Sequence, residues 1–265
     1  MSLKQILRPL VPPIILDALR ATRAGPLSFT GDYPSWSEAG AAAGGYDSKE
    51  ILERVAAATR RVVNGEAVYE RDSMVFDHIE YSWPVLASLL RVALQSKSLR
   101  VVDFGGSLGS TLRQNRRFLK DLPVPVSWRV VEQDHFVERG LQEFSTPTLG
   151  FDRSIPEAAA RGADVVLFLS SLCYVAEPRV FLEQAAEAAR YVIIDRFPLI
   201  PGGRDRVVLQ RVTEPIYSAT YPIRLFGAEH IESGLLAGWR PIERWDCDLQ
   251  PGAQVRWVGY FLERA

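Results

Sequence analysis

The chain has 265 residues, of which 47% are hydrophobic and 24% charged, and its formal net charge is -1. This composition is typical of a soluble globular protein, with room for one large domain or one domain with a substantial appendage. Non-specific nucleic-acid binders usually carry a basic excess, which this sequence lacks, so we expect no nucleic-acid partner.

Cysteine and histidine are scarce. The two cysteines, Cys173 and Cys247, belong to no CxxC pair, and the three histidines show no metal-ligand spacing. We therefore predict neither a disulfide framework nor a metal site. Free thiols of this kind fit a reducing cytoplasm.

The first residues combine basic and apolar side chains, as a signal peptide does. Pro12 and Pro13 interrupt the apolar stretch and Asp17 ends it, so we reject a cleaved signal. No apolar run approaches the roughly 18 residues that a membrane span needs. We expect residues 1–24 to form a short amphipathic helix that docks on the protein, with peripheral membrane contact as the alternative.

The next elements are predicted to cover an active site. Residues 26–48 are rich in Gly, Pro, Ser and aromatics and indicate a long ordered loop with at most a short helix. Apolar periodicity predicts a helix that Asn64-Gly65 ends, and a second helix over 81–96. We assign residues 1–95 to an N-terminal helical and loop cap, and 96–265 to a second domain.

The second domain alternates short apolar runs with helix-like segments. The runs cover residues 99–106, 126–133, 163–175 and 191–199. This alternation predicts a parallel sheet with helices on both faces. Residues 228–239 look helical, and 240–249 and 254–264 look like two strands joined by a turn at 250–253. The predicted fold is α/β and Rossmann-like, with a mostly parallel sheet and a C-terminal antiparallel hairpin, and this layout resembles the known sheet of class I methyltransferases.

The stretch VVDFGGSLGS, residues 101–110, follows the first of these runs. Its glycines do not match the spacing of the dinucleotide fingerprint or of the phosphate-binding P-loop. They match the looser acid-x-Gly-x-x-x-Gly pattern of S-adenosylmethionine sites, and a purely structural turn is the alternative. The cofactor contacts that we predict in this turn are Asp103, Gly105, Gly106, Ser107 and Gly109.

Three later segments supply further candidate contacts, because ligands of open α/β sheets bind outside the carboxyl ends of the strands. Glu132 ends the second run, where its carboxylate can accept hydrogen bonds from both ribose hydroxyls, with Gln133 beside it. A solvated glutamate at a helix start is the alternative. Asp152 is a candidate for the adenine amino group, or lies in a surface turn. Ser170 ends the third run, beneath the expected methyl-transfer centre.

Catalytic and substrate residues are predicted from position and chemistry alone. The candidate bases are His78, whose neutral imidazole can accept a hydroxyl proton near pH 7, and Asp195 at the end of the fourth run. The alternatives are a packing histidine and an Asp195–Arg196 ion pair. The side chains expected to contact the substrate are Tyr69, Glu70, Arg71, Asp72, Tyr174, Arg196, Tyr217 and Tyr221.

The sequence resembles a family of S-adenosylmethionine-dependent methyltransferases that are often encoded among bacterial surface-polysaccharide genes. The stretches that carry the resemblance are GGYD (44–47), YERDS (69–73), VVDFGGSLGS (101–110), WRVVEQ (128–133), LSSLCYV (169–175), VIIDR (192–196) and IYSATYP (216–222). The resemblance implies the class I fold and a cofactor held by Asp103, Gly105, Gly109 and Glu132. It implies no catalytic residues.

The expected function is transfer of a methyl group from S-adenosylmethionine to a hydroxyl of a sugar, glycan precursor or related small metabolite. The first alternative is a protein of this fold that binds the cofactor without catalysis, as a scaffold or regulator. The second alternative is a nucleotide-sugar or NAD enzyme, against which the missing diphosphate loop argues.

Overall fold

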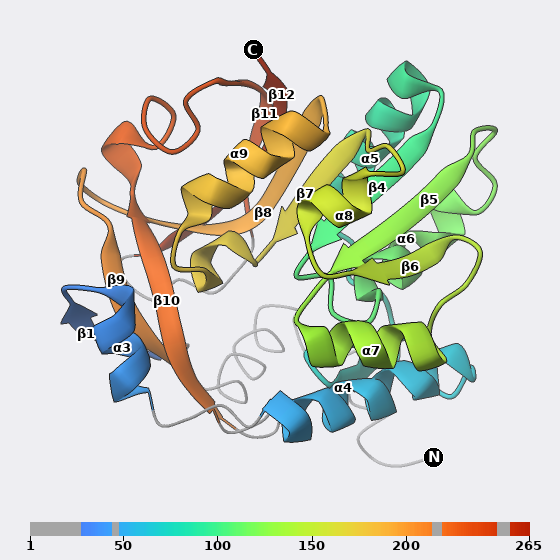
Figure 1. Ribbon diagram of the computed structural model, residues 1–265, viewed down its shortest axis with the longest axis horizontal. Helices are drawn as coiled ribbons and strands as arrows, with labels where there is room; N and C mark the ends of the chain where they lie inside the picture. Colours follow the sequence, from blue (N-terminus) through green and yellow to red (C-terminus); the bar gives the residue numbers. More distant parts are fainter. Residues whose placement is uncertain (1–27, 44–47, 214–218, 248–254) are drawn as a thin grey trace, which may run out of the picture.

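The computed structural model describes residues 28–43, 48–213, 219–247 and 255–265 (Figure 1). The expected N-terminal helix, the GGYD stretch, Tyr217 and the turn at 250–253 lie outside the described residues.

The helices agree with the apolar periodicity of the sequence. Those described are α3 (Trp36–Ala42), α4 (Ser48–Val63), α5 (Trp83–Ser96), α6 (Ser110–Leu119), α7 (Asp134–Glu143), α8 (Ile155–Ala159) and α9 (Pro178–Ala188), with 3-10 turns η2 (Leu172–Tyr174) and η3 (Ala228–His230). The end of α4 before Asn64-Gly65 confirms the prediction. Prolines in the first turn of α5, α8 and α9 start those helices, where no backbone donor is needed.

The strands form one large sheet and one small hairpin. Their bounds are β1 (Ser28–Tyr33), β2 (Tyr69–Arg71), β3 (Met74–Phe76), β4 (Leu99–Phe104), β5 (Val126–Val131), β6 (Leu149–Asp152), β7 (Val165–Leu169), β8 (Tyr191–Ile200), β9 (Arg206–Val212), β10 (Ala219–Gly227), β11 (Trp239–Asp246) and β12 (Arg256–Arg264). The parallel strands run in the order β6, β5, β4, β7, β8. Beyond β8 come antiparallel β12 and then β11. The predicted fold class, including the C-terminal hairpin, is confirmed.

Alternate residues of the parallel strands enter two separate hydrophobic cores. Val101, Val165 and Ile193 pack with α4, α5, α6 and α7. Val102, Val166 and Val192 pack with α8 and α9 on the opposite face. Because both faces are covered, the strands are apolar throughout, which is why their sequences show continuous rather than alternating hydrophobicity.

A branch of antiparallel strands leaves the far end of β8. The last residues of β8 pair with β10, which pairs with β9, and β1 pairs with the outer edge of β9. The sequence did not predict β1, β9 or β10. Residues 28–33 were expected in a loop. Four of the six residues of β1 are exposed and none is fully buried, so an edge strand held by its backbone leaves no apolar pattern.

Other differences from the predicted elements have similar causes. Residues 228–239 contain the short turn η3 and further turns before β11 begins, instead of a helix. Gly234 and Gly238 lie in this segment and disfavour a continuous helix. The short strands β2, β3 and β6 were also missed, since three or four residues are too few for a periodic pattern.

A buried carboxyl group near the end of β4 is bonded to the middle of β5. Asp103 is 1% exposed, and its Oδ2 accepts a hydrogen bond from Nε1 of the fully buried Trp128 at 2.9 Å. Thr111 at the start of α6 also bonds to this carboxyl. Burial raises the pKa of Asp103 to about 7, although both hydrogen bonds act in the opposite direction.

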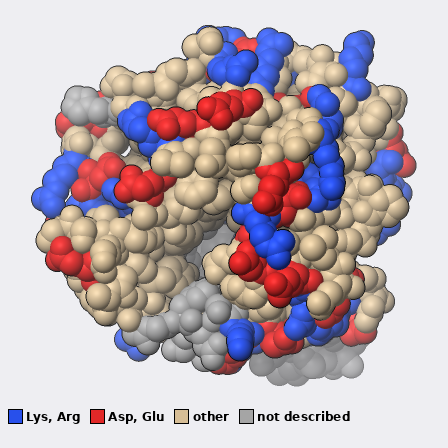
Figure 2. All heavy atoms as spheres, viewed as in Figure 1, with Lys and Arg blue, Asp and Glu red and all other residues tan. Residues whose placement is uncertain are grey.

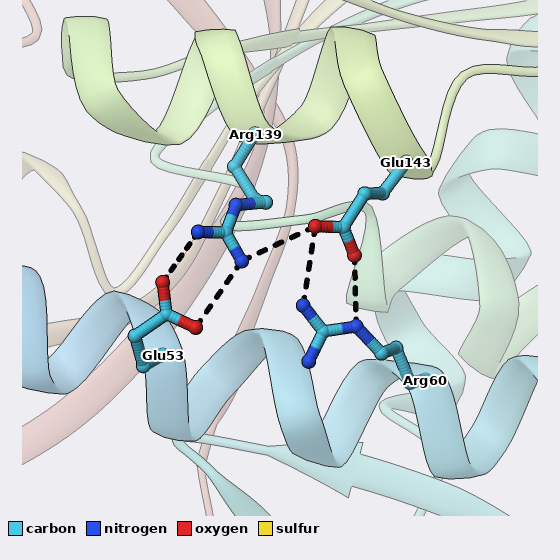
Figure 3. Close-up of polar contacts among 4 residues, drawn as sticks. All are labelled: Glu53, Arg60, Arg139 and Glu143. Carbon is cyan, nitrogen blue, oxygen red and sulfur yellow. Dashed lines mark hydrogen bonds and ion pairs between the residues drawn. The ribbon is translucent and has the colours of Figure 1, made fainter.

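Helix α4 is fastened to α7 by a chain of ion pairs (Figure 3). Arg139 contacts Glu53 and also Glu143, the latter at 3.2 Å. Glu143 in turn accepts from Nε of Arg60 at 2.8 Å. These contacts join an N-terminal helix to a helix that covers the sheet, and Figure 1 shows α4 lying along α7.

We expect Arg139→Ala to lower the free energy of unfolding by about 1 kcal/mol, because two partly exposed ion pairs are lost together. The loss should shrink in high salt, which screens such pairs. Urea unfolding at low and high ionic strength measures both effects. Arg117→Ala is the control, since Arg117 is an exposed arginine of α6 to which no ion pair is assigned among the described residues. Equal losses in the two variants would contradict the prediction.

The Asp103 carboxyl should make stability depend on pH. Its folded-state pKa of about 7 lies above the ordinary value of 3.8, so the folded protein holds a proton that the unfolded chain releases between these values. This contribution therefore favours folding at low pH and is lost as pH rises towards 7. In urea unfolding, we expect D103N to gain at least about 1 kcal/mol relative to the unmodified protein between pH 5 and pH 8. A constant difference between the two proteins would rule this out.

Candidate functional site

Several predicted site residues lie together along the carboxyl edge of the parallel sheet. The amide of Gly105 donates to the carbonyl of Val131 at 2.9 Å. The amide of Glu132 donates to the backbone carbonyl of Asp152 at 3.2 Å, and the amide of Ser170 donates to the backbone carbonyl of Asp195 at 2.9 Å. Adjacent strand ends are thus bonded to one another. In Figure 1 the arrowheads of β4, β5 and β7 point towards the middle of the view, where Figure 2 shows the surface hollowed.

The glycine turn follows β4 and packs tightly against its neighbours. Gly105 has φ of +73°, and a Cβ there would lie 2.8 Å from Cβ of Ser171. A Cβ on Gly106 would lie 2.6 Å from the carboxyl carbon of Asp103. Side chains at these positions would separate the turn from β7 and from the buried acid. The pair of glycines therefore lets the backbone rest directly on Asp103 and Ser171.

Asp103 lies beneath this turn. Its carboxyl is almost fully buried and already bonded to Trp128. The structure places it as a support for the turn, because the backbone of Gly106 lies directly against it.

Glu132 joins the end of β5 to the glycine turn. Its Oε1 accepts from the amide of Ser107 at 3.2 Å, and its Oε2 accepts from the amide of Gln133 at 3.0 Å. Burial raises the pKa of Glu132 above its ordinary value, although the hydrogen bonds from these two amides act to lower it. A carboxylate oxygen has more than one acceptor position, so each oxygen keeps capacity for a ligand hydroxyl.

Asp152 at the end of β6 and Ser170 after β7 lie on either side of the strand ends of β4 and β5. Asp152 forms a two-pronged ion pair with Arg129, at 2.6 Å and 2.7 Å, so its carboxylate is already engaged at the end of β6. Ser170 follows β7. The neighbouring Ser171, which our site prediction omitted, has a buried hydroxyl with no hydrogen-bond partner among the described residues.

Three residues other than glycine adopt positive φ at this edge. They are Ser107 at +55°, Ser170 at +59° and Arg196 at +54°. Side chains rarely adopt this conformation, and strained backbone of this kind concentrates at functional sites. Arg196 belongs to a bulge in β8, because Asp195 and Arg196 together lie opposite Gly259 of β12.

The hairpin of β2 and β3 packs against the start of α6. Asp72 and Ser73 form its two-residue turn, both with positive φ, as tight hairpins require. Glu70 is 2% exposed, and its Oε1 accepts from the hydroxyl of Ser110, the first residue of α6. Burial raises the pKa of Glu70 to about 7, and the hydrogen bond from Ser110 opposes that rise.

Tyr69 and Arg71 of the same hairpin have different surroundings. Tyr69 is buried, which raises the pKa of its hydroxyl to about 12, and the positive charge of Arg196 lies close enough to act against that rise. Arg71 forms an ion pair with Glu80, with 3.7 Å between Nη2 and Oε2. The hairpin therefore brings Tyr69 near the bulge of β8, which the sequence alone did not predict.

The two candidate bases differ in their contacts. The half-exposed His78 places Nδ1 2.7 Å from Asp77 and Nε2 3.6 Å from Glu80. Asp195 is 3% exposed, and its Oδ1 accepts from Nε1 of Trp245 at 2.8 Å and from the thiol of Cys247 at 3.3 Å. Asp195 is therefore held inside the protein towards β11, and His78 lies in a surface loop.

Two of the predicted substrate tyrosines lie together. The hydroxyl of Tyr174 donates to Oε1 of the buried Gln210 at 2.9 Å. The ring of Tyr221 meets the ring of Tyr174 edge to face at 5.5 Å. Strands β9 and β10 therefore contact η2 through Gln210 and Tyr221, both of which meet Tyr174.

A cavity of about 350 Å³ lies near the start of α9, with Arg179, Asp205 and Arg224 in its lining. None of its lining residues was predicted as a site residue, so we do not assign the cofactor there. Within the described ranges, no cluster of three or more His, Cys, Asp or Glu side chains could hold a metal ion. The helices described include none long and apolar enough to cross a membrane.

No protein-family model matches the chain, and no curated protein matches it. Solved structures of similar fold include the N-terminal domain of EvdMO1, determined in the presence of SAH and D-fucose. That domain is 15% identical, with 83% of this chain and 98% of that chain covered and a TM-score of 0.49. The N-methyltransferase NodS from Bradyrhizobium japonicum WM9, in complex with SAH, is 13% identical, with 81% and 97% covered and a TM-score of 0.45. The glycopeptide N-methyltransferase MtfA, complexed with SAM, is 13% identical, with 62% and 86% covered and a TM-score of 0.42.

Proposed function

We propose that the protein binds S-adenosylmethionine at the carboxyl edge of its sheet and transfers the methyl group to a small acceptor. The observation that carries this proposal is the position of Glu132, fixed by the amides of Ser107 and Gln133 beside the glycine turn. An acid at this place in a Rossmann-like sheet binds ribose hydroxyls. The wider contact set comprises Gly105, Gly106, Ser107, Gly109, Gln133 and Ser170, with Asp103 supporting the turn from below and Asp152 at the adenine side.

The charges around the turn favour this cofactor over a dinucleotide. Asp103, Glu132 and Glu70 are three acids near the turn, and burial raises the pKa of each. A diphosphate would add negative charge to this group, whereas the sulfonium and ammonium of S-adenosylmethionine add positive charge. The electrostatics therefore support the methyltransferase proposal against the NAD or nucleotide-sugar alternative.

The chemistry is an in-line displacement. An acceptor oxygen forms a bond to the methyl carbon as the carbon–sulfur bond breaks, the electron pair stays on sulfur, and the acceptor proton passes to a base. Alignment of acceptor and methyl group supplies most of the acceleration. The chain's contribution is to hold the acceptor, for which Tyr69, Arg71, Asp72, Arg196, Tyr174 and Tyr221 are the candidates, together with Tyr217 outside the described residues.

We favour His78 over Asp195 as the base. The carboxylate of Asp77 lies 2.7 Å from Nδ1 of His78 and can orient the ring, as carboxylates orient catalytic histidines. Asp195 is buried, and its Oδ1 already accepts from Trp245 and Cys247, so that oxygen is less able to take a proton from an acceptor. We further propose an acceptor hydroxyl on a sugar, glycan precursor or related metabolite, without a metal. Both described cysteines are free, consistent with a cytoplasmic location.

A scaffold or regulator of this fold would bind the cofactor as the methyltransferase does, and would differ from it only in transferring no methyl group. Incubation with S-adenosylmethionine and a panel of sugars and nucleotide sugars, followed by mass spectrometry, tests for the gain of one methyl group. We expect methylation, and a fall in kcat of about 100-fold or more for His78→Ala if that ring is the base. Asp195→Asn should keep at least a third of the rate. Binding of cofactor with no acceptor methylated would favour the scaffold.

Glu132→Gln should weaken binding of S-adenosylmethionine and of its demethylated product S-adenosylhomocysteine by about 10- to 100-fold. The reason is that charge-assisted hydrogen bonds to the ribose hydroxyls are replaced by weaker ones. Isothermal titration calorimetry measures the change. Glu138→Gln is the matched control, because it removes a carboxylate of α7 whose side chain is 63% exposed. If neither compound binds the unmodified protein, the methyltransferase proposal fails.

A further inference from the structure

Resting on the proposed function, we propose that Glu70 binds the ammonium group at the methionine end of the cofactor. The adjoining carboxylate of the methionine would bind at the N-terminus of α6. Glu70 belongs to the N-terminal hairpin and not to the glycine turn, so this assigns part of the cofactor site to the predicted cap.

The first reason is an unsatisfied oxygen. Glu70 is 2% exposed, and Ser110 occupies only its Oε1. Oε2 is buried and has no hydrogen-bond partner among the described residues. A buried carboxylate oxygen without a donor is unfavourable, and a partner is therefore expected.

Neither protonation state of Glu70 removes the difficulty. The ionised carboxylate lacks a donor at Oε2, and a proton placed on Oε2 would lack an acceptor. The charged groups that act on Glu70 are Arg71, Asp72 and Arg113. Arg71 is paired with Glu80, and Arg113 donates to the carbonyl of Leu108, so neither arginine bonds to Glu70. No described residue supplies the missing donor, and we infer that a ligand does.

The second reason is position. Glu132 marks the ribose end of the proposed site, and the glycine turn continues from Ser107 beside it to Ser110. The end of the cofactor beyond the ribose therefore meets the start of α6, where Glu70 lies.

The start of α6 is suited to the other charge of an amino acid. Helix α6 has ten residues, and its N-cap Gly109 has no side chain to bond the first free amides. These amides and the helix dipole favour an anion. A helix N-terminus beside a buried carboxylate thus matches a zwitterion, with its carboxylate at the helix and its ammonium at Glu70.

The test compares three ligands by isothermal titration calorimetry. S-adenosylhomocysteine carries the whole amino-acid end, its deaminated analogue lacks only the ammonium, and 5′-methylthioadenosine lacks the amino-acid end. Each is titrated into the unmodified protein, Glu70→Gln and Glu70→Asp. Glu66→Gln is the control, because it removes an exposed acid shortly before the same hairpin. Thermal unfolding of each variant reports whether it is folded.

We expect Glu70→Gln to raise the Kd of S-adenosylhomocysteine by about 10- to 100-fold. The Kd values of the deaminated analogue and of 5′-methylthioadenosine should change less than about threefold, as should every value for Glu66→Gln. Glu70→Asp retains the charge and should give a smaller loss for S-adenosylhomocysteine, which keeps the test open if Glu70→Gln does not fold.

Two results would overturn the assignment. One is a change of less than threefold for S-adenosylhomocysteine in both Glu70 variants. The other is an equal loss for all three ligands, which would mean that Glu70 acts only on the fold of the turn. If the unmodified protein binds none of the three compounds, the proposed function itself is wrong and the assignment falls with it. Binding of all three without discrimination by Glu70 leaves the proposed function intact.

Discussion

The contact between the Asp103 carboxyl and the indole of Trp128 determines how the carboxyl edge of this sheet is built. Both groups are almost fully buried, and a buried carboxyl is tolerated only when its oxygens find donors. The indole supplies one donor from β5, and Thr111 supplies another from α6. One acid thus fixes the end of β4, the middle of β5 and the start of α6 relative to one another. Gly106 can then pass directly over that acid, since it has no side chain to displace it.

The acids around the glycine turn also interact with one another through their charges. Glu132 lies close enough to raise the pKa of Asp103, so two acids share the space around the turn, and Glu70 adds a third at the start of α6. Like charges in a buried site destabilise one another, and a cation relieves that repulsion. In the absence of a cation, the buried acids can hold protons instead. The free protein and a complex with a cationic cofactor should therefore differ in protonation at this edge.

The sequence was sufficient for those parts of the fold that rest on long periodic patterns. Four buried parallel strands, the helices between them and the terminal hairpin were predicted, because residues buried on both faces of a strand must be apolar. The strands β1, β9 and β10 were not predicted. An exposed edge strand such as β1 is held by backbone pairing to β9 and leaves no side-chain pattern.

The same contrast applies to the site. Glycine spacing and the acid after β5 could be recognised, since each follows a strand directly. The pairing of Asp152 with Arg129, the contacts of Asp195 with Trp245 and Cys247, and the bond between Ser110 and Glu70 join side chains from 23 to 52 positions apart. Local patterns carry no information about such contacts. These long-range contacts determine which of the acids predicted from the sequence still have an oxygen available for a ligand.

Helix α4 and the β2–β3 hairpin are bonded to the helices beside the glycine turn. Helix α4 is fastened to α7, whose first residues follow Glu132 and Gln133, and the β2–β3 hairpin is bonded to the first residue of α6. Gln114 of α6 also donates to the carbonyl of Glu80, in the loop that carries His78. The helices that present the two ends of the proposed cofactor site therefore also position the proposed base and the hairpin. A displacement of α6 or α7 that accompanies cofactor binding would therefore be transmitted directly to the residues that we propose to face the acceptor.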